Sequence, residues 1–279
     1  MAYNGSITPY ATMTATIQLY TNIVHWVTFF YKQLKLEKYE KKTGRKLANT
    51  IINTIALAIF KQLNTIATKK AIYRIFEPRG TYKTMVVNMN RFALIVLVIL
   101  KSILLCNRKH AHPIKHTDAT DIPVCLSKNA NRHRTMRGLA RWGYSTKGLF
   151  YGLKMHITTD LKRRVLSVKF TCGNVHETKV FTDLNKDLLG LFVVDAAYVS
   201  EKLAKDFNIE GKRLIMAKPR KNMKKVITPL QYAIYNTRML IELNFRNLKL
   251  FYGLITSLPR SVNGYMANYI YSLLAYHVA

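Results

Sequence analysis

GLFVVD, residues 190–195, is a short apolar run that begins at a glycine and ends in an acid. Runs of this length that are rich in Val and Phe and bounded by turn residues are typical of buried strands. Beyond it, the pattern predicts a short helix from about 200 to 207 and another strand at RLIMAK, residues 213–218. The stretch therefore reads as strand, helix, strand, with Asp195 at the end of the first strand.

Three further strands are expected before GLFVVD. LFYGLKMHIT (149–158) and RVLSVKFT (164–171) are strand-like segments separated by a short polar turn at 160–163, which predicts a hairpin. PIKHTDA (113–119) alternates Ile114, His116 and Asp118 and predicts a short strand. A helix is expected from 177 to about 187, between the hairpin and GLFVVD.

YNTRMLIELNFRNLK, residues 235–249, follows the last strand and carries the spacing Tyr-x2-Arg-x3-Glu-x6-Lys. At 3.6 residues per turn, Tyr235, Arg238, Glu242 and Lys249 share one helix face. The helix is expected to start near Thr228 and Pro229, where Thr can cap and Pro suits the first turn. Glu242 is the only acid after Glu210, so it is either an ion-pair partner of a neighbouring arginine or a metal ligand.

The resulting order is β, β, β, α, β, α, β, α, which is the order of the ribonuclease-H-like fold. The predicted fold class is thus α/β, with a mixed sheet and flanking helices. In this fold an acid on the first strand, an acid after the fourth strand and an acid on the helix after the fifth converge. Here they are Asp118, Asp195 and Glu242, which we interpret as ligands of two Mg²⁺ or Mn²⁺ ions. Asp121 is the alternative to Asp118.

The chain before residue 108 has helical apolar spacing, with helices expected at about 14–35, 46–64, 67–77 and 83–106. We therefore divide the chain into an all-α region, 1–107, and a catalytic domain, 108–279. Residues 126–148 are polar and basic and are predicted to form a long loop, and a final helix is expected at about 261–277.

The composition points to a polyanionic partner. Lys and Arg total 44 against 14 Asp and Glu, which gives a formal charge of +30. DNA or RNA is the first candidate partner and an anionic membrane the second. The apolar run at 92–106 is short and contains Lys101, so a buried helix is the preferred interpretation. We find no secretory signal at 1–14 and no zinc-type spacing of the three cysteines, and we expect a cytoplasmic protein without a membrane partner.

Several segments together resemble the bacterial insertion-sequence transposases of the DDE class. They are DATDIPVC (118–125), GLFYGLKMH (148–156), CGNVHE (172–177), VVDAAYVS (193–200), KPRKNMK (218–224), the Tyr-Arg-Glu-Lys helix, and PRSVNGYMANYIYSLLAY (259–276). The Tyr-Arg-Glu-Lys spacing is a signature of these transposases. Two positions depart from the family pattern: Asp121, where Pro is more usual, and Ala197, where the family often has Gly.

This resemblance implies a transposase that cuts double-stranded DNA at element ends and joins them to target DNA, working as a dimer or larger assembly near the bacterial nucleoid. It implies Asp118, Asp195 and Glu242 as catalytic acids, with residues 1–107 binding the ends. Basic and polar side chains are expected to contact phosphate: Arg238, Lys249, Lys218, Arg220, Lys221, Asn222 and Lys224. Two alternatives stay open, a metal-dependent nuclease without strand transfer and an inactive DNA-binding remnant.

Overall fold

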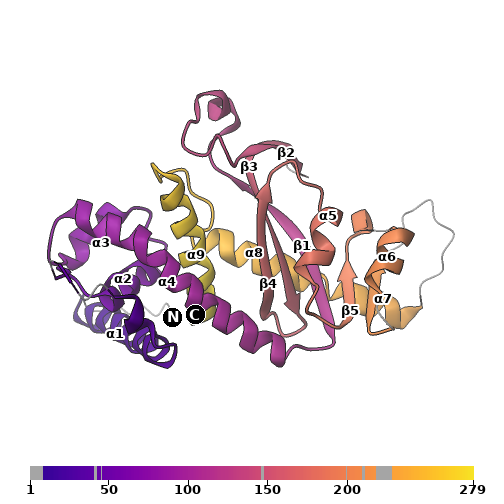
Figure 1. The fold of residues 1–279 in the computed structure, drawn as a ribbon, viewed down its shortest axis with the longest axis horizontal. Helices are drawn as coiled ribbons and strands as arrows, with labels where there is room; N and C mark the ends of the chain where they lie inside the picture. Colours follow the sequence, from indigo (N-terminus) through magenta and orange to yellow (C-terminus); the bar gives the residue numbers. More distant parts are fainter. Residues whose placement is uncertain are drawn as a thin grey trace, which may run out of the picture. The chain divides into compact units, whose positions relative to one another are not determined.

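The computed structural model describes residues 9–40, 43–44, 46–145, 148–198, 200–208, 211–217 and 228–279 (Figure 1). The chain forms two compact units. The first comprises Met1–Leu100, Leu250–Leu254 and Asn263–Ala279, and the second comprises Lys101–Lys249 and Ile255–Val262. The last helix of the chain thus belongs to the unit formed by the N-terminal helices.

The described part of the first unit is helical, as the apolar spacing predicts. Its elements are α1 (Pro9–Gln33), the 3-10 turn η1 (Leu36–Tyr39), α2 (Ile51–Leu63), α3 (Lys69–Phe76), the first part of α4 (Tyr82–Lys109) and α9 (Val262–Val278). Nine of the thirteen residues of α2 are buried, so this helix is the core of the unit. Gln62 Nε2 donates to Ser272 Oγ at 2.8 Å and Tyr271 Oη donates to the Met89 carbonyl at 3.0 Å, which joins α9 to α2 and α4.

Helix α4 is the one described helix whose length and composition would allow it to cross a membrane. Its buried residues, including Met85, Met89, Phe92 and Val96, recur every three or four positions and so form one face. A helix with one face in a protein core passes the same test of length and composition, so this is weak evidence for a membrane.

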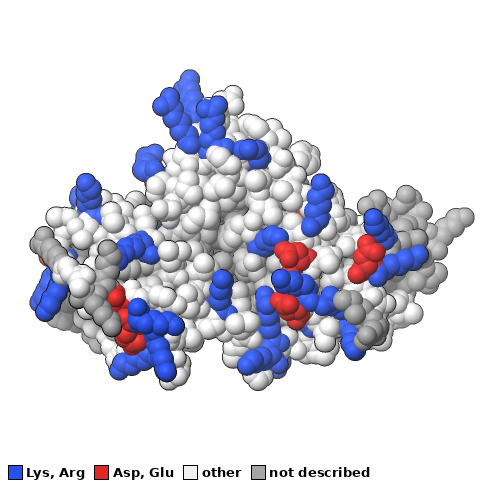
Figure 2. All heavy atoms as spheres, in the orientation of Figure 1, with Lys and Arg blue, Asp and Glu red and all other residues white. Residues whose placement is uncertain are grey.

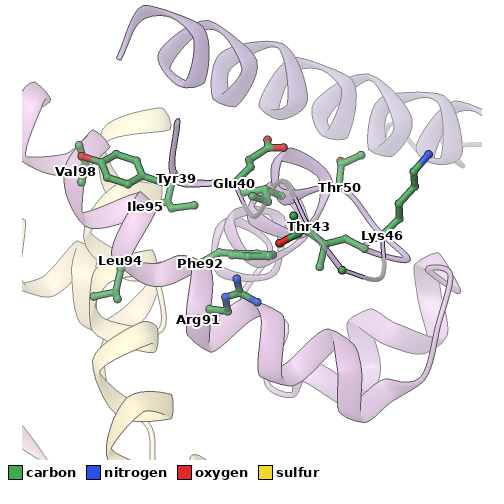
Figure 3. A pocket seen from close by; sticks show the side chains of 13 residues that line it. Tyr39, Glu40, Thr43, Lys46, Thr50, Arg91, Phe92, Leu94, Ile95 and Val98 are labelled. Carbon is green, nitrogen blue, oxygen red and sulfur yellow. The ribbon is translucent and has the colours of Figure 1, made fainter. Parts of the chain in front are cut away.

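A pocket of about 1040 Å³ lies within the first unit, between α4 and the segment that links η1 to α2 (Figure 3). Phe92, Ile95 and Val98 of α4 line one side, and Tyr39 and Leu47 belong to the other. None of the acids Asp118, Asp195 and Glu242 lines it. It is therefore separate from the site described below.

The second unit is built on a six-stranded mixed sheet. Its strands are β1 (Ile114–Pro123), β2 (Arg141–Ser145), β3 (Gly148–Asp160), β4 (Val165–Cys172), β5 (Gly190–Val194) and β6 (Arg213–Ala217). The path through the sheet is β2-β3-β1-β5-β6, and β4 also pairs with β3. β3 is antiparallel to β1, β2 and β4, whereas β1, β5 and β6 are mutually parallel. The five expected strands and their order in the chain are present.

Helices flank this sheet. They are α5 (Thr178–Leu184), α6 (Glu201–Phe207), α7 (Pro229–Asn236) and α8 (Met239–Leu250), with the 3-10 turns η2 (Ser127–Arg132) and η3 (Ala196–Tyr198). α5 contacts β3 and β4, α6 contacts β6, and α7 contacts β5. Phe181, Phe192 and Phe207 meet with ring centroids 4.8–6.0 Å apart and form the centre of the core under α5 and α6.

Two expectations are wrong in detail. Residues 126–148 are not all loop, because Arg141–Ser145 form strand β2, paired with the start of β3. The helix through 235–249 is not continuous. The backbone N–H groups of Arg238, Leu240 and Ile241 donate to carbonyls three residues back, so α7 ends and α8 begins at a tight turn. The Thr237 hydroxyl donates to the Ile234 carbonyl at 2.6 Å and competes with the helical bonding there.

The pairing of β1 with β3 predicts a sharp glycine requirement at residue 152. A Cβ at Gly152 would overlap the backbone carbonyl of Ile122 across the strand pair, whereas a Cβ at Gly138 meets nothing within 4 Å. We expect Gly152→Ala to lower the free energy of unfolding by about 1–3 kcal/mol or more, because the strands must separate to fit it. Gly138→Ala is the matched control and should stay within about 0.5 kcal/mol of the parent. Urea unfolding of both variants is the measurement, and equal stability would contradict the pairing register.

Candidate active site

Asp118 and Asp195 are brought together by the parallel pairing of β1 with β5. The register aligns Lys115 with Phe192 and His116 with Val193. The pairing ends there, and Asp195 follows β5 directly; continuing the same register by two residues would put it beside Asp118, and the charge of Asp195 acts on Asp118. Each carboxylate accepts a hydrogen bond from the next backbone N–H, that of Ala119 at 2.8 Å and that of Ala196 at 2.7 Å.

Arg238 joins Asp118 to Glu242. Its Nη1 lies 2.8 Å from Asp118 Oδ2, and its Nη2 lies 2.8 Å from Glu242 Oε1. The Arg238 and Asp118 side chains are 18% and 16% exposed, whereas the Glu242 side chain is 58% exposed. The Arg238 guanidinium therefore bridges two predicted catalytic acids. Asp118 lies inside the site, and Glu242 lies at its solvent-exposed side.

The face of β1 that carries Asp118 is also the face that meets the turn between α7 and α8. Side chains alternate across a strand, so His116 and Asp118 point to the same side of the sheet. His116 Nε2 lies 2.8 Å from the Thr237 hydroxyl, beside Arg238 in sequence. Thr117 points to the other side, where its hydroxyl lies 2.9 Å from the Thr158 hydroxyl. The turn that interrupts the helix is thus the part that reaches Asp118.

Asp121 has a different partner. Its Oδ1 lies 3.0 Å from Lys249 Nζ, and both side chains are mostly buried. Arg238 and Lys249, which we expected to contact phosphate, are therefore each paired with an acid of β1 in the protein alone. The two acids considered for the first catalytic position differ in surroundings, because only Asp118 is linked to Glu242.

Burial controls the protonation of Asp118. Removal from water raises the pKa of this carboxyl to about 7, and the charges of Glu177 and Asp195 act in the same direction. The Arg238 guanidinium and the Ala119 N–H oppose the rise. An acid with a pKa near neutrality in a cluster of carboxylates is typical of functional sites.

Glu177 and Tyr198 belong to this site but were not predicted to do so. Glu177 Oε1 lies 3.6 Å from Lys154 Nζ, and Lys154 is aligned with Asp121 across β1 and β3. Burial and the charge of Glu177 raise the pKa of Tyr198, whose hydroxyl also has a side-chain hydrogen bond with Glu177. Tyr198 is 1% exposed and lies three residues after Asp195, so this bond anchors the turn that carries Asp195. The lone acid of CGNVHE was the available sequence signal.

Burial favours the neutral form of two histidines of the sheet, His116 and His156. Burial lowers the pKa of His116 and that of His156 to about 4. His156 Nε2 lies 2.9 Å from the Thr171 hydroxyl, and His176 Nδ1 lies 2.8 Å from that of Thr178. Both histidines are therefore engaged in hydrogen bonds to threonine side chains.

The predicted phosphate-binding segment lies outside the described residues. This applies to Lys218, Arg220, Lys221, Asn222 and Lys224. Trp142 of β2 is 38% exposed and packs on Tyr151 with ring centroids 5.5 Å apart.

Within the described part of the chain, no group of three or more His, Cys, Asp or Glu side chains is arranged to hold a metal ion. Asp118 and Asp195 are neighbours, but Glu242 is turned toward Arg238. The carboxylate oxygens themselves are the hard donors that Mg²⁺ prefers, and Mg²⁺ commonly takes only one or two carboxylates. The donor chemistry therefore fits a divalent metal.

The fold and site define an α/β protein with an acidic cluster on a strongly basic chain. A family described as transposase DDE domain matches residues 108–261, which is more than half of the chain. No curated protein and no solved structure matches the chain. The chain belongs to the family of transposases with a DDE domain, and this membership implies a DNA substrate.

The raised pKa of Asp118 predicts a specific dependence of stability on pH. A carboxyl with a higher pKa in the folded state than in the unfolded state binds more protons when folded. Its contribution to the free energy of unfolding therefore falls as pH rises from the unfolded-state pKa to the folded-state pKa. The neutral amide of an Asp118→Asn variant mimics the protonated acid at every pH. We expect the stability of Asp118→Asn relative to the parent to increase from about pH 4 to about pH 7 and to be constant above.

Urea unfolding of both proteins at five pH values between 4.5 and 8.5 measures this difference. The matched control is Asp183→Asn, because Asp183 is an exposed acid whose pKa is lowered by Lys169. Its stability difference should not increase between pH 4.5 and 7. A relative stability of Asp118→Asn that falls with pH would show that Arg238 outweighs burial.

Proposed function

We propose that the protein is a DNA transposase that cuts at the ends of an insertion sequence and transfers the freed strand into target DNA. The observation that carries the proposal is the link of Asp118 to Glu242 through Arg238, with Asp195 directly after the strand that pairs in parallel with the strand of Asp118. Family membership supports the same substrate class.

We propose further that the sheet is ribonuclease-H-like. Support comes from the order β4-β3-β1-β5-β6, in which three antiparallel strands are followed by two parallel ones. β2 is then an addition beside β3. In this fold the acids on the first strand, after the fourth strand and on the following helix meet at one edge, which corresponds to Asp118, Asp195 and Glu242.

Asp118, Asp195 and Glu242 would hold two divalent ions, Mg²⁺ or Mn²⁺. Such ions activate an attacking oxygen and stabilise a leaving oxygen in phosphodiester chemistry. Arg238 keeps Asp118 and Glu242 close together in the protein alone, because its positive charge offsets their repulsion. The exposed carboxylate of Glu242 is free to change direction when the site is loaded.

The proposed reaction has two steps. In the first step the oxygen of water attacks the phosphorus at the element end, and the bond to the 3′ oxygen breaks to give a 3′ hydroxyl. In the second step that hydroxyl attacks a target phosphorus and releases a target 3′ hydroxyl.

The chain's own residues would position the DNA. The side chains proposed to contact phosphates near the reacting bonds are Arg238, Lys249, Lys218, Arg220, Lys221, Asn222 and Lys224.

The remaining assignments complete the proposal. Residues 1–107 would bind the element ends, and residues 108–279 would form the catalytic domain, whose last helix α9 packs with the N-terminal helices. The enzyme would act in the cytoplasm on chromosomal DNA, as a dimer or larger assembly, because two ends must be joined.

Conservative substitutions of the acids test the proposed function. Asp118→Asn, Asp195→Asn and Glu242→Gln each remove one ligand charge and nearly preserve shape. We expect each variant to bind end DNA while single-turnover cutting falls by at least about two orders of magnitude, because the reacting oxygens lose stabilisation. The measurement is cleavage of labelled element ends with Mg²⁺ or Mn²⁺, beside the melting temperature of each variant.

Asp121→Asn is the control, since it changes an acid of the same strand that pairs with Lys249. It should lose some stability but keep most cutting. Cutting by Glu242→Gln at the parental rate would refute the metal-ligand assignment. Cleavage without joining of a pre-cut end would indicate a nuclease, and end binding without any cutting by the parent would indicate an inactive remnant.

A further inference from the structure

The segment between β1 and β2, residues 124–140, forms a folded knob on the second unit (Figure 1). It contains η2 and a series of tight turns. The backbone N–H of Asn129 donates to the Leu126 carbonyl at 2.8 Å, and that of Ala140 donates to the Met136 carbonyl at 2.7 Å. Met136 and Ala140 are fully buried, and η2 contacts β3, so the knob is a packed part of the unit. Its surface is therefore pre-formed.

The exposed side chains of this knob are strongly basic. Lys128, Arg132, Arg134 and Arg137 are exposed, as is Arg141 at the start of β2. The sequence contains no acid between Asp121 and Asp160. Figure 2 shows Lys and Arg side chains gathered on the knob, with no Asp or Glu beside them on this face.

Several cations of the second unit have acidic partners, whereas those of the knob form no ion pair in the described structure. Arg108 pairs with Asp187 and Lys169 pairs with Asp183. In the described structure none of the five basic residues on and beside the knob forms an ion pair; Arg141 Nη1 donates to the carbonyls of Arg137 and Ala140 instead. Like charges held this close repel one another, and a polyanion relieves that repulsion.

Arginine-rich surfaces of this kind match phosphate. Four of the five cations are Arg, whose planar guanidinium can donate two parallel hydrogen bonds to one phosphate. Duplex DNA presents a negative charge about every 1.7 Å along its axis, so several of these side chains can be neutralised together. The knob is thus suited to a duplex backbone and not to one small anion.

The position of the knob relates it to the catalytic acids. β1 runs from Asp118 toward the knob, which starts six residues later. At about 3.3 Å per residue this is roughly 20 Å along the strand. A duplex rises about 3.4 Å per base pair, so the same distance spans about six base pairs.

We propose that this knob clamps the phosphate backbone of the duplex held at the acids, about six base pairs from the bond that is cut. The inference rests on the proposed function, because it takes the acidic cluster as the cutting site. It adds a second, sequence-independent contact that orients the element end on the enzyme.

The test is the salt dependence of DNA binding by the full chain, measured without divalent metal so that no cutting occurs. The probe is an element-end duplex extending at least fifteen base pairs on each side of the cut. The variant is Arg132→Gln, Arg134→Gln, Arg137→Gln combined. Each lost phosphate contact removes about 0.9 from the slope of log K against log salt, so we expect a slope shallower by about 2–3.

The matched control removes three exposed charges elsewhere on the same unit, Lys186→Gln, Lys202→Gln and Lys205→Gln combined. Its slope should change by less than about 1. The charge-preserving set Arg132→Lys, Arg134→Lys, Arg137→Lys should keep most of the parental slope. Equal slopes for parent and glutamine variant, or equal losses in variant and control, would overturn the proposal, provided that all melt at the parental temperature.

A shortened duplex locates the contact. With a duplex that ends about three base pairs from the cut on both sides, the parent and the glutamine variant should bind with the same salt slope, because this duplex is too short to reach the knob. A persistent difference would place a separate duplex, such as target DNA, on the knob and would refute the proposal. Loss of binding to anionic phospholipid vesicles with unchanged DNA binding would also refute it.

Because DNA binding is measured without cutting, the result of the salt-dependence test does not depend on the cleavage results of the acid variants. Parental cutting by Asp118→Asn would end the proposed function, whereas an unchanged slope would end only the knob assignment.

Discussion

The parallel pairing of β1 with β5 is the constraint on which the site depends. Because the two strands run in the same direction and are aligned at His116 and Val193, Asp118 on β1 and Asp195 directly after β5 lie near each other. Burial and the charge of Asp195 both disfavour the ionised form of Asp118 and raise its pKa. Arg238 opposes this rise, which explains why the chain breaks its helix at Thr237 to bring that residue to β1.

A chain with a formal charge of +30 has few acids to use, and the second unit concentrates several of them around β1. Asp118, Asp121 and Glu177 each have a specific basic partner, from α8, its preceding turn or β3. The knob between β1 and β2 lacks such acids. This division leaves a paired, partly buried cluster at the sheet edge and an unpaired basic surface about 20 Å along the strand, a spacing set by the strand rise.

Local sequence patterns predicted most elements of the fold. The strands at 149–158 and 164–171 and the helix at 200–207 were predicted within two residues of their observed bounds, because apolar alternation and turn residues act locally. β2 was missed because most residues of Arg141–Ser145 are exposed, so pairing with β3 and not burial defines the strand. The break at Thr237 was missed because helical spacing continues across it.

The sequence by itself determined the order of five of the six strands along the chain, the helical N-terminal region and the basic character, and it singled out three candidate acids. The tertiary structure decided which groups meet. Only the strand pairing brings Asp118 near Asp195, only the break before α8 places Arg238 between Asp118 and Glu242, and only packing brings Glu177 to Tyr198. It also decided that α9, last in the chain, completes the helical unit through Ser272 and Tyr271. Contacts between residues distant in sequence depend on packing and register, which local propensity does not encode.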